Sequence, residues 1–173
     1  KAVPESVLKD YPGLYKKAEK NAAQKLSPEG KLINAMASEL HEEWRAPRKI
    51  GNTDKYEPRW KDPKDSQFSE KWLERIKSGE KVENIRLNQE GKVEMDIANT
   101  PYSGLTDAWK AENRASAEAA IGSVARAMRE KQPLNNDFIE SASSSIHDKW
   151  LERNRAWAPP EQNKPYEELS ENE

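Results

Sequence analysis

The chain has 173 residues, with 29 Lys and Arg against 31 Asp and Glu, and only 34% of its residues are hydrophobic. It contains no cysteine, which excludes a disulfide framework, a thiol nucleophile and a cysteine-based zinc site. No apolar run approaches the ~20 residues that a membrane helix needs, so we expect a soluble, cytoplasmic protein with no membrane contact. Six tryptophans and five tyrosines supply large apolar areas, which favours a thin but ordered helical core.

Two stretches near the start of the chain have the spacing of helices. Residues 1–26 predict a helical extension interrupted by Pro12 and Gly13. Ser27 is placed to cap the next helix, and Pro28 to occupy its first position. The apolar face of that helix is marked by residues three and four apart, namely Leu32, Ile33, Met36, Leu40 and Trp44.

The segment from 46 to 95 differs in composition from the predicted helices on either side of it. Residues 51–66 are dense in turn-forming and charged residues and predict an exposed loop. Phe68 to Ile76 predicts a short helix that is ended by Ser78 and Gly79. Apolar and polar residues then alternate on both sides of a turn at 88–91, which predicts a β-hairpin over 85–95. We expect this hairpin to be the only sheet.

Two further helices follow. Thr106 is a candidate N-cap for a helix whose apolar face runs from Trp109 to Met128, before Gln132 and Pro133 end it. Asn135 or Asn136 caps the last helix, and Ser170 stands where another N-cap belongs. The apolar face of the last helix consists of Phe138, Ile139, Ala142, Ile146 and Trp150.

Two parts of the chain resemble each other. SELHEEW at 38–44 aligns with SSIHDKW at 144–150 at a constant offset of 106 residues, and the apolar residues upstream keep that offset. PYSGLTD at 101–107 resembles PYEELSE at 165–171. The repeated unit is therefore a helix, a loop, a Pro-Tyr-x-x-Leu segment and the start of a second helix.

This duplication defines the fold class and the domains that we expect. The fold is mainly α, a tandem of pseudo-symmetric helical repeats with one small β-hairpin in an insertion of the first copy. Residues 1–26 form a helical extension, 27–132 the first unit with the insertion 46–95, and 133–173 a second unit that is cut short at Glu173.

A family pattern accounts for both copies. The first copy carries it through Leu40, His41, Trp44, Arg48, Pro101, Tyr102, Leu105 and Asp107. The second copy carries it through Ile146, His147, Trp150, Trp157, Pro165, Tyr166, Leu169 and Glu171. This order resembles the RyR repeat domain, the small helical module of ryanodine receptors and of bacterial and phage proteins. The segments HEEWRAPRK, YEPRWK, DIANTPY and HDKWLERN also resemble bacterial proteins without an established activity. The resemblance implies a tandem helical fold and little chemistry.

His41 and His147 occupy equivalent places in the repeat, which favours a shared structural role over a catalytic or metal site made once. We expect each imidazole to hydrogen-bond the loop or Pro-Tyr segment of its own unit, and a ligand-facing imidazole is the alternative. Trp44 and Trp150 end the apolar faces, where we expect them to close a small core rather than stack on a ligand. The tyrosine hydroxyl of each Pro-Tyr segment is a candidate partner for the histidine of the same unit.

The most basic stretch follows the first predicted helix. Arginine side chains bind phosphate and carboxylate groups through two parallel hydrogen bonds. The expected recognition surface is a groove between the first helix, the loop at 46–66 and the Pro-Tyr segment. Its ligand-binding candidates are Arg45, Arg48, Arg59, Trp60, Tyr102 and His41, and Lys49 and Lys61 lie in the same basic stretch. The equivalent candidates of the second copy are His147, Trp150, Arg153, Arg155 and Tyr166.

These features predict a non-enzymatic binding module for a small anionic, nucleotide-like ligand or an acidic protein segment. The sequence has no Gly-rich phosphate loop, nucleophile elbow or metal-ligand spacing, so we expect no catalytic residue, metal or cofactor. The slightly acidic charge balance argues against nucleic acid as a partner.

Two alternatives stay open. One is a structural or assembly protein of phage or bacterial origin, monomeric or homodimeric, that makes protein contacts only. The other is catalysis near His41 and Asp96, because an acid just before the first Pro-Tyr segment needs a histidine within reach and His41 is the candidate. For Asp96 itself, a cap that bonds nearby backbone amides is the favoured interpretation.

Overall fold

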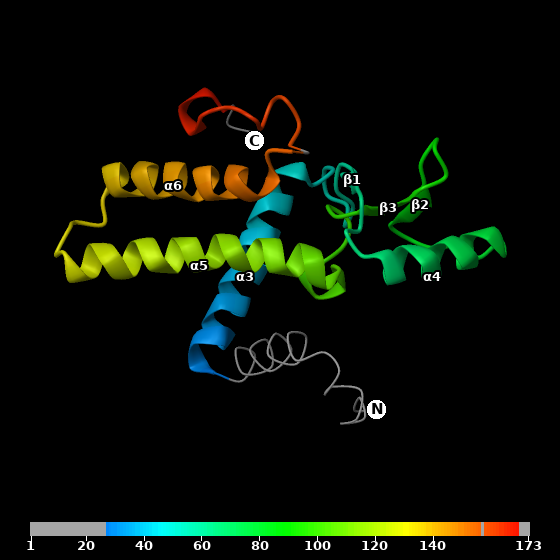
Figure 1. The fold of residues 1–173 in the computed structure, drawn as a ribbon, viewed down its shortest axis with the longest axis horizontal. Coiled ribbons are helices and arrows are strands. Elements are labelled where there is room, and N and C mark those ends of the chain that lie inside the picture. Colours follow the sequence, from blue (N-terminus) through cyan, green and yellow to red (C-terminus); the bar gives the residue numbers. More distant parts are fainter. Residues whose placement is uncertain (1–26, 157, 170–173) are drawn as a thin grey trace.

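The computed structural model describes residues 27–156 and 158–169, and over these residues it is mainly helical with one small antiparallel sheet (Figure 1). The expected extension 1–26, the Ser170 cap, and Trp157 and Glu171 of the family pattern lie outside the described residues. The α-helices are α3 (Pro28–Arg45), α4 (Ser66–Lys77), α5 (Asp107–Arg129) and α6 (Asn136–Asn154). The strands are β1 (Trp60–Lys61), β2 (Ile85–Leu87) and β3 (Val93–Asp96), and the short 3-10 turns are η1 (Ala46–Arg48), η2 (Tyr102–Gly104) and η3 (Tyr166–Glu168).

Each helix begins at a side-chain cap. The Ser27 hydroxyl accepts from the backbone N–H of Gly30 at 2.9 Å, and Pro28 fills the first helical position. Thr106 and Asn135 cap α5 and α6, as predicted. The Thr106 hydroxyl accepts from the backbone N–H of Trp109 at 3.4 Å, and the Asn135 side-chain oxygen accepts from that of Phe138 at 3.0 Å. These caps satisfy N–H groups that have no partner inside the helix, so the predicted starts of α3, α5 and α6 are confirmed.

The predicted hairpin is present, but it supplies only two of the three strands of the sheet. β2 pairs with β3 in an antiparallel register, with Ile85 opposite Met95, and Gly91 in the turn takes a φ of 75°. The strand β1 adds to the other edge of β3 and gives the order β1-β3-β2. The expectation of one isolated hairpin is therefore corrected to a three-stranded sheet. A strand of two residues has too few side chains to show alternation in the sequence.

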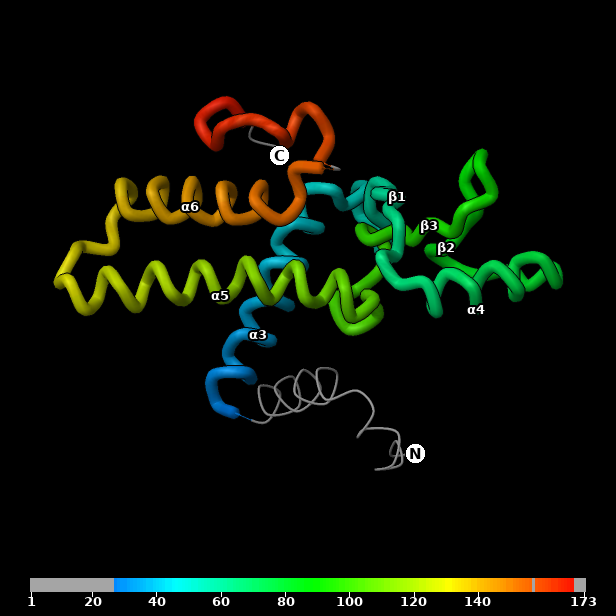
Figure 2. The backbone as a smooth tube through the Cα atoms, in the orientation of Figure 1, coloured from blue at the N-terminus to red at the C-terminus, as the bar shows by residue number. Residues whose placement is uncertain are grey.

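The described chain has two parts, one made of α3, α5 and α6 and the other of the sheet and α4, and they meet at the start of α5 (Figure 1). α6 returns antiparallel alongside α5, and α3 crosses α5 steeply (Figures 1 and 2). The sheet and α4 lie together at the end of α5 that is away from the loop between α5 and α6 (Figure 2). No helix in the described ranges is both long enough and apolar enough to cross a membrane.

Two clusters of buried side chains hold these parts together. At the crossing of α3 and α5, fully buried Ala37 and Ala117 let the two backbones approach, and Ile33 packs beside them. Between the sheet and the start of α5, a second cluster contains Met95, Ile97, Leu105 and Trp109. Tyr102 of η2 packs against both clusters, so the Pro-Tyr segment joins the helical part to the sheet.

Candidate ligand-binding site

The two histidines make the same contacts in the two halves of the chain. His41 stacks on Trp44 with ring centroids 5.8 Å apart, and His147 stacks on Trp150 at 6.0 Å. The Nε2 atom of His41 donates to the carbonyl oxygen of Thr100 at 2.9 Å, which directly precedes the first Pro-Tyr segment. The Nε2 atom of His147 donates at 2.7 Å to the carbonyl oxygen that directly precedes the second. The prediction that each imidazole bonds the loop of its own unit is confirmed.

The residue seven positions after each histidine makes the same hydrogen bond in both segments. A guanidinium nitrogen of Arg48 donates to the carbonyl oxygen of Trp44, and the side-chain amide of Asn154 donates to that of Trp150. The tyrosines of η2 and η3 lie tilted against His41 and His147, both with centroids 6.4 Å apart. The two segments therefore share local geometry as well as sequence.

The hydroxyl of Tyr102 does not meet His41. Among the described residues, the buried Tyr102 hydroxyl has no hydrogen-bond partner, because the Nε2 atom of His41 is taken by the Thr100 carbonyl. In the second unit the Tyr166 hydroxyl donates to Glu140 at 3.3 Å rather than to His147. The predicted tyrosine–histidine hydrogen bonds are therefore wrong, and the contact between these rings is one of packing.

Because the Tyr102 hydroxyl is buried without a partner, its removal should cost little stability. A buried hydroxyl without a partner costs its desolvation, and deleting it leaves no other group unpaired. We expect Tyr102→Phe to leave the free energy of unfolding within about 0.5 kcal/mol of the wild type or to raise it. Urea denaturation measures this free energy, and Tyr102→Ala, which removes the packing as well, is the destabilised control. A loss of about 1 kcal/mol or more in Tyr102→Phe would mean that the hydroxyl is bonded after all.

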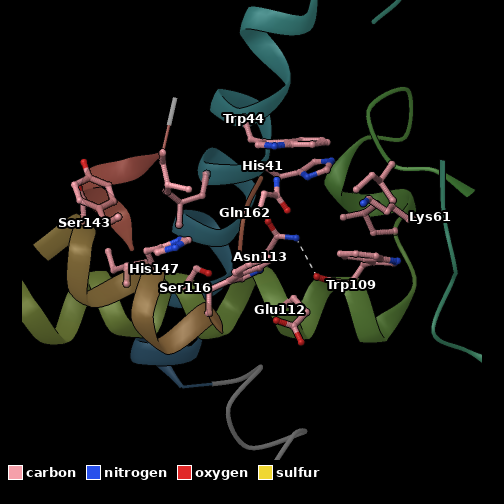
Figure 3. A pocket seen from close by; sticks show the side chains of 17 residues that line it. His41, Trp44, Lys61, Trp109, Glu112, Asn113, Ser116, Ser143, His147 and Gln162 are labelled. Atoms are coloured by element: carbon pink, nitrogen blue, oxygen red, sulfur yellow. Dashed lines mark hydrogen bonds between the residues drawn. The ribbon is translucent and has the colours of Figure 1, made fainter. Parts of the chain in front are cut away.

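A cavity of about 500 Å³ joins the two His–Trp pairs. Its wall on one side contains His41, Trp44, Leu105 and Trp109, and on the other side His147, Trp150, Tyr166 and Leu169. Figure 3 shows His41 with Trp44, and His147 with the side chains of α6, around a common space above α5. The volume lies in the range of clefts that bind small molecules, about 300–1,000 Å³.

Polar side chains also line the cavity. They are Asn113 and Ser116 of α5, Ser143 of α6, and Gln162 of the segment that leads to η3 (Figure 3). Asn113 donates its side-chain amide to the carbonyl oxygen of Trp109 at 2.9 Å, so its own side-chain oxygen remains an acceptor. The wall of the cavity therefore combines aromatic with uncharged polar side chains.

Of the two charged residues that line the cavity, Glu112 forms ion pairs with described residues and Lys61 does not. Glu112 is surrounded by Lys64 at 3.9 Å, Arg153 at 3.3 Å and the amide of Asn154 at 3.2 Å. Lys61 of β1 lines the same cavity and has no ion pair among the described residues. Lys64 and Arg153, which do not line the cavity, neutralise the charge of Glu112. Lys61 is therefore the cation in the cavity wall that can pair with an anionic ligand.

The protonation state of His41 follows from its surroundings. Burial lowers the pKa of His41 below its usual value, and this outweighs the Thr100 carbonyl and Glu42, which raise it. Arg45 lowers the pKa of the same imidazole further. His41 is therefore neutral at pH 7, and since its Nε2 carries the proton given to Thr100, its Nδ1 is an acceptor.

The arginines of the basic stretch do not line this cavity. Arg45 is buried, donates from Nε to the carbonyl oxygen of Ala98 at 2.7 Å and lies over the ring of Tyr56 at 4.2 Å. Arg48 is buried with its guanidinium over Trp44, 4.4 Å from the ring centroid. The Arg45 guanidinium thus joins α3 to the loop at 46–56 and to the segment that precedes η2, and the Arg48 guanidinium joins that loop to α3.

The other predicted candidates are divided between the cavity and the surface. Arg59 is exposed, and Trp60 is half-buried under the guanidinium of Arg86 at 4.2 Å. Arg153 and Arg155 are exposed at the end of α6. The predicted candidates that line the cavity are His41, His147, Trp150 and Tyr166, whereas Arg45, Arg48, Arg59, Trp60, Tyr102, Arg153 and Arg155 do not.

Asp96 has the role of a cap. One carboxylate oxygen accepts from the backbone N–H groups of Arg59, Ala98 and Asn99 at 2.9–3.3 Å, and the other accepts from the Asn99 amide at 2.7 Å. This agrees with the interpretation that Asp96 bonds nearby backbone amides. No group of three or more metal-binding side chains gathers within the described part of the chain.

Sequence reasoning missed most of the polar wall and Trp109 as a cavity residue. Asn113, Ser116 and Gln162 carry no motif, and Trp109 reads as an ordinary core residue of an amphipathic helix. One signal was available. The equal offset of the two His–Trp pairs predicts two like surfaces, but only the crossing of the helices shows that these surfaces border the same cavity.

Comparisons with protein-family models, with curated proteins and with solved structures found no match for this chain.

Proposed function

We propose that this chain is a non-enzymatic binding module built from two diverged RyR-like units, and that its cavity takes a small anionic, nucleotide-like ligand. The observation that carries the proposal is that one cavity of about 500 Å³ borders both His–Trp pairs. The tandem arrangement is supported by the equal contacts of the two histidines with their tryptophans and with the carbonyl group before each Pro-Tyr segment.

The chemistry of the wall favours a flat ligand. Trp109 and Trp150 line one small space, whereas Trp44, which also borders it, has His41 stacked on its ring and the Arg48 guanidinium over it and packs against the core, as predicted. Stacking of a base on an aromatic side chain contributes about 1–3 kcal/mol. A cavity walled by three helices suits a small molecule better than an extended acidic protein segment, which needs an open groove.

The charge that selects an anion comes from Lys61. Its ammonium borders the cavity beside Trp109 (Figure 3), and Glu112, the acidic residue in the wall, is held by Lys64 and Arg153. A phosphate or carboxylate group on the ligand gains a charge-assisted hydrogen bond there. Lys61 thus takes the anion-binding role that the sequence suggested for the neighbouring arginines.

The proposal predicts a ligand-dependent rise in melting temperature that requires Trp150. A ligand at a hundred times its dissociation constant adds about 2.7 kcal/mol, which for a domain of this size raises Tm by about 5–11 °C. We expect a nucleotide in a thermal-shift panel to produce such a rise in the wild type and not in Trp150→Ala. The matched control is Trp72→Ala, since Trp72 lies on α4 against Phe68 and outside the cavity.

The panel contains nucleotides, sugar phosphates and small carboxylates at fixed ionic strength. A rise that survives in Trp150→Ala but is lost in Trp72→Ala would place the ligand elsewhere. No rise for any compound would remove the small-ligand proposal.

A second candidate function, a structural or assembly protein, is favoured by exposed apolar side chains near the loop between α5 and α6. Met128 is 68% exposed, Leu134 55% and Ile139 54%. Ile33, at the position in α3 equivalent to Ile139, is only 7% exposed because it packs at the crossing with α5. Analytical ultracentrifugation separates the two candidates, because an assembly protein forms a stable oligomer without ligand and a binding module need not.

A further inference from the structure

We infer that the end of the α5 and α6 pair that carries the loop between the two helices binds the same surface of a second copy of this chain. The surface centres on three exposed apolar side chains, Met128, Leu134 and Ile139, which we call the apolar tip. None of them lines the cavity, so the inference does not rest on the proposed ligand.

The apolar tip lies at one end of the molecule. Met128 is the last residue but one of α5, Leu134 lies in the loop that follows, and Ile139 is near the start of α6. Because α6 returns antiparallel alongside α5, these three positions share the end of the helix pair that is away from the sheet (Figure 1). Exposed apolar side chains that are surrounded by polar residues mark interaction surfaces.

The repeat shows that this face of α6 is a packing face. Ile139 is equivalent to Ile33 of α3 through the offset of 106 residues between the two units. Ile33 is buried because α5 crosses α3 there, where Ala37 meets Ala117. Within the described part of the chain, nothing covers Ile139 in this way. A helix from a second copy would give Ile139 the surroundings that Ile33 already has.

The charges beside the apolar tip complement one another between two copies. Arg126 and Arg129 lie at the end of α5, Asp137 and Glu140 lie near the start of α6, and all four are exposed. None of them forms an ion pair with another described residue. About a two-fold axis, the basic end of α5 in each copy can meet the acidic start of α6 in the other. Such complementarity favours a second copy over other partners.

Helix-end electrostatics alone do not account for these acids. An acidic side chain at the start of a helix stabilises that helix through its dipole, and Glu29 does so in α3. At the positions equivalent to Asp137 and Glu140, however, α3 has Lys31 and Asn34. These two acids therefore occur in the unit whose apolar face is exposed, which favours a role in association.

Pairing through the apolar tip leaves the cavity accessible. The residues of α5 that line the cavity run from Trp109 to Ser116, in the half of the helix that is away from the tip. A two-fold axis closes the assembly at two copies. The inference thus names the partner in the protein contacts of the second candidate function, and it does not exclude a ligand in the cavity.

The first test measures self-association with an apolar variant and its matched control. Sedimentation equilibrium of the full chain at several concentrations gives the Kd of the dimer. We expect Leu134→Ser to raise this Kd about tenfold or more, because each dimer loses two buried leucines. Leu32→Ser should leave it unchanged, since Leu32 of α3 is also 55% exposed and lies outside the tip. A chain that is monomeric at every concentration, or equal effects of the two variants, would overturn the inference.

The second test exchanges the charges. One variant carries Arg126→Glu and Arg129→Glu, and the other carries Asp137→Lys and Glu140→Lys. Each variant alone places like charges opposite each other on both sides of the axis, so its Kd should rise about tenfold or more. An equimolar mixture should regain the wild-type affinity, because the mixed dimer again pairs opposite charges on both sides. Recovery in the mixture also shows that both variants are folded.

The outcomes of the charge exchange are separate from those of the ligand test. If either variant dimerises as tightly as the wild type, or if the mixture regains no affinity, the inference is overturned. The small-ligand proposal then still stands or fails on the thermal-shift panel with Trp150→Ala.

Discussion

Trp109→Ala should lower the free energy of unfolding by about 3–5 kcal/mol, the usual cost of truncating a buried tryptophan. Trp109 packs with Met95, Ile97 and Leu105, and only 9% of its surface is exposed. Its indole N–H also donates to the carbonyl oxygen of Asp62 at 2.9 Å, so its removal leaves a cavity and an unpaired acceptor. For a chain of this length, that loss lowers Tm by about 6–20 °C.

Differential scanning calorimetry measures the change, and Trp72→Ala is the matched control. Trp72 is half-buried on α4, a helix without a fully buried residue, and Arg75 covers its ring at 3.9 Å. Its truncation removes less buried area, so its effect should be clearly smaller. Equal losses in the two variants would show that the cluster around Trp109 is not the main connection between the sheet and α5.

Asp96→Ala should destabilise the protein by about 2–4 kcal/mol, because it leaves three backbone N–H groups without their acceptor. These groups belong to Arg59, Ala98 and Asn99, and they position the strand β1 and the segment before η2. Asp96 is itself only 3% exposed, so water replaces little of what is lost. Urea denaturation with a fixed m value gives the difference directly.

Asp96→Asn separates hydrogen bonding from the other effects of truncation. The side-chain oxygen of the introduced asparagine can still accept from the three backbone N–H groups. Its NH₂ group, however, replaces the second carboxylate oxygen, which in the wild type accepts from the Asn99 side-chain amide, so two donors face each other. We expect a loss of about 1–2 kcal/mol, between the wild type and Asp96→Ala. If Asp96→Ala is as stable as the wild type, the cap contributes nothing to the fold.

The hydrogen bonds around Asp96 connect the stability predictions to the cavity. Thr100, whose carbonyl holds His41, also donates its hydroxyl to the backbone carbonyl of Asp96 at 2.7 Å. The network that organises the loop before η2 therefore also orients one imidazole of the cavity.

Local signals in the sequence determined much of the secondary structure of the described residues. The caps Ser27, Thr106 and Asn135 and the hairpin turn near Gly91 are where the pattern predicted them, since a cap or a turn depends on residues three or four positions apart. The sequence also established that the His41 and His147 segments are alike, because that comparison needs no knowledge of their contacts.

The tertiary structure alone decided what these segments do together. The strand β1 exists because β3 offers it an edge, and Arg45 and Arg48 are buried because backbone carbonyls and aromatic rings lie within reach of their guanidinium groups. The cavity forms where α3, α5 and α6 meet, which brings residues more than a hundred positions apart into one wall. Helix periodicity specifies which face of a helix is buried, but the crossing of helices depends on side-chain volumes at distant contacts such as Ala37 and Ala117.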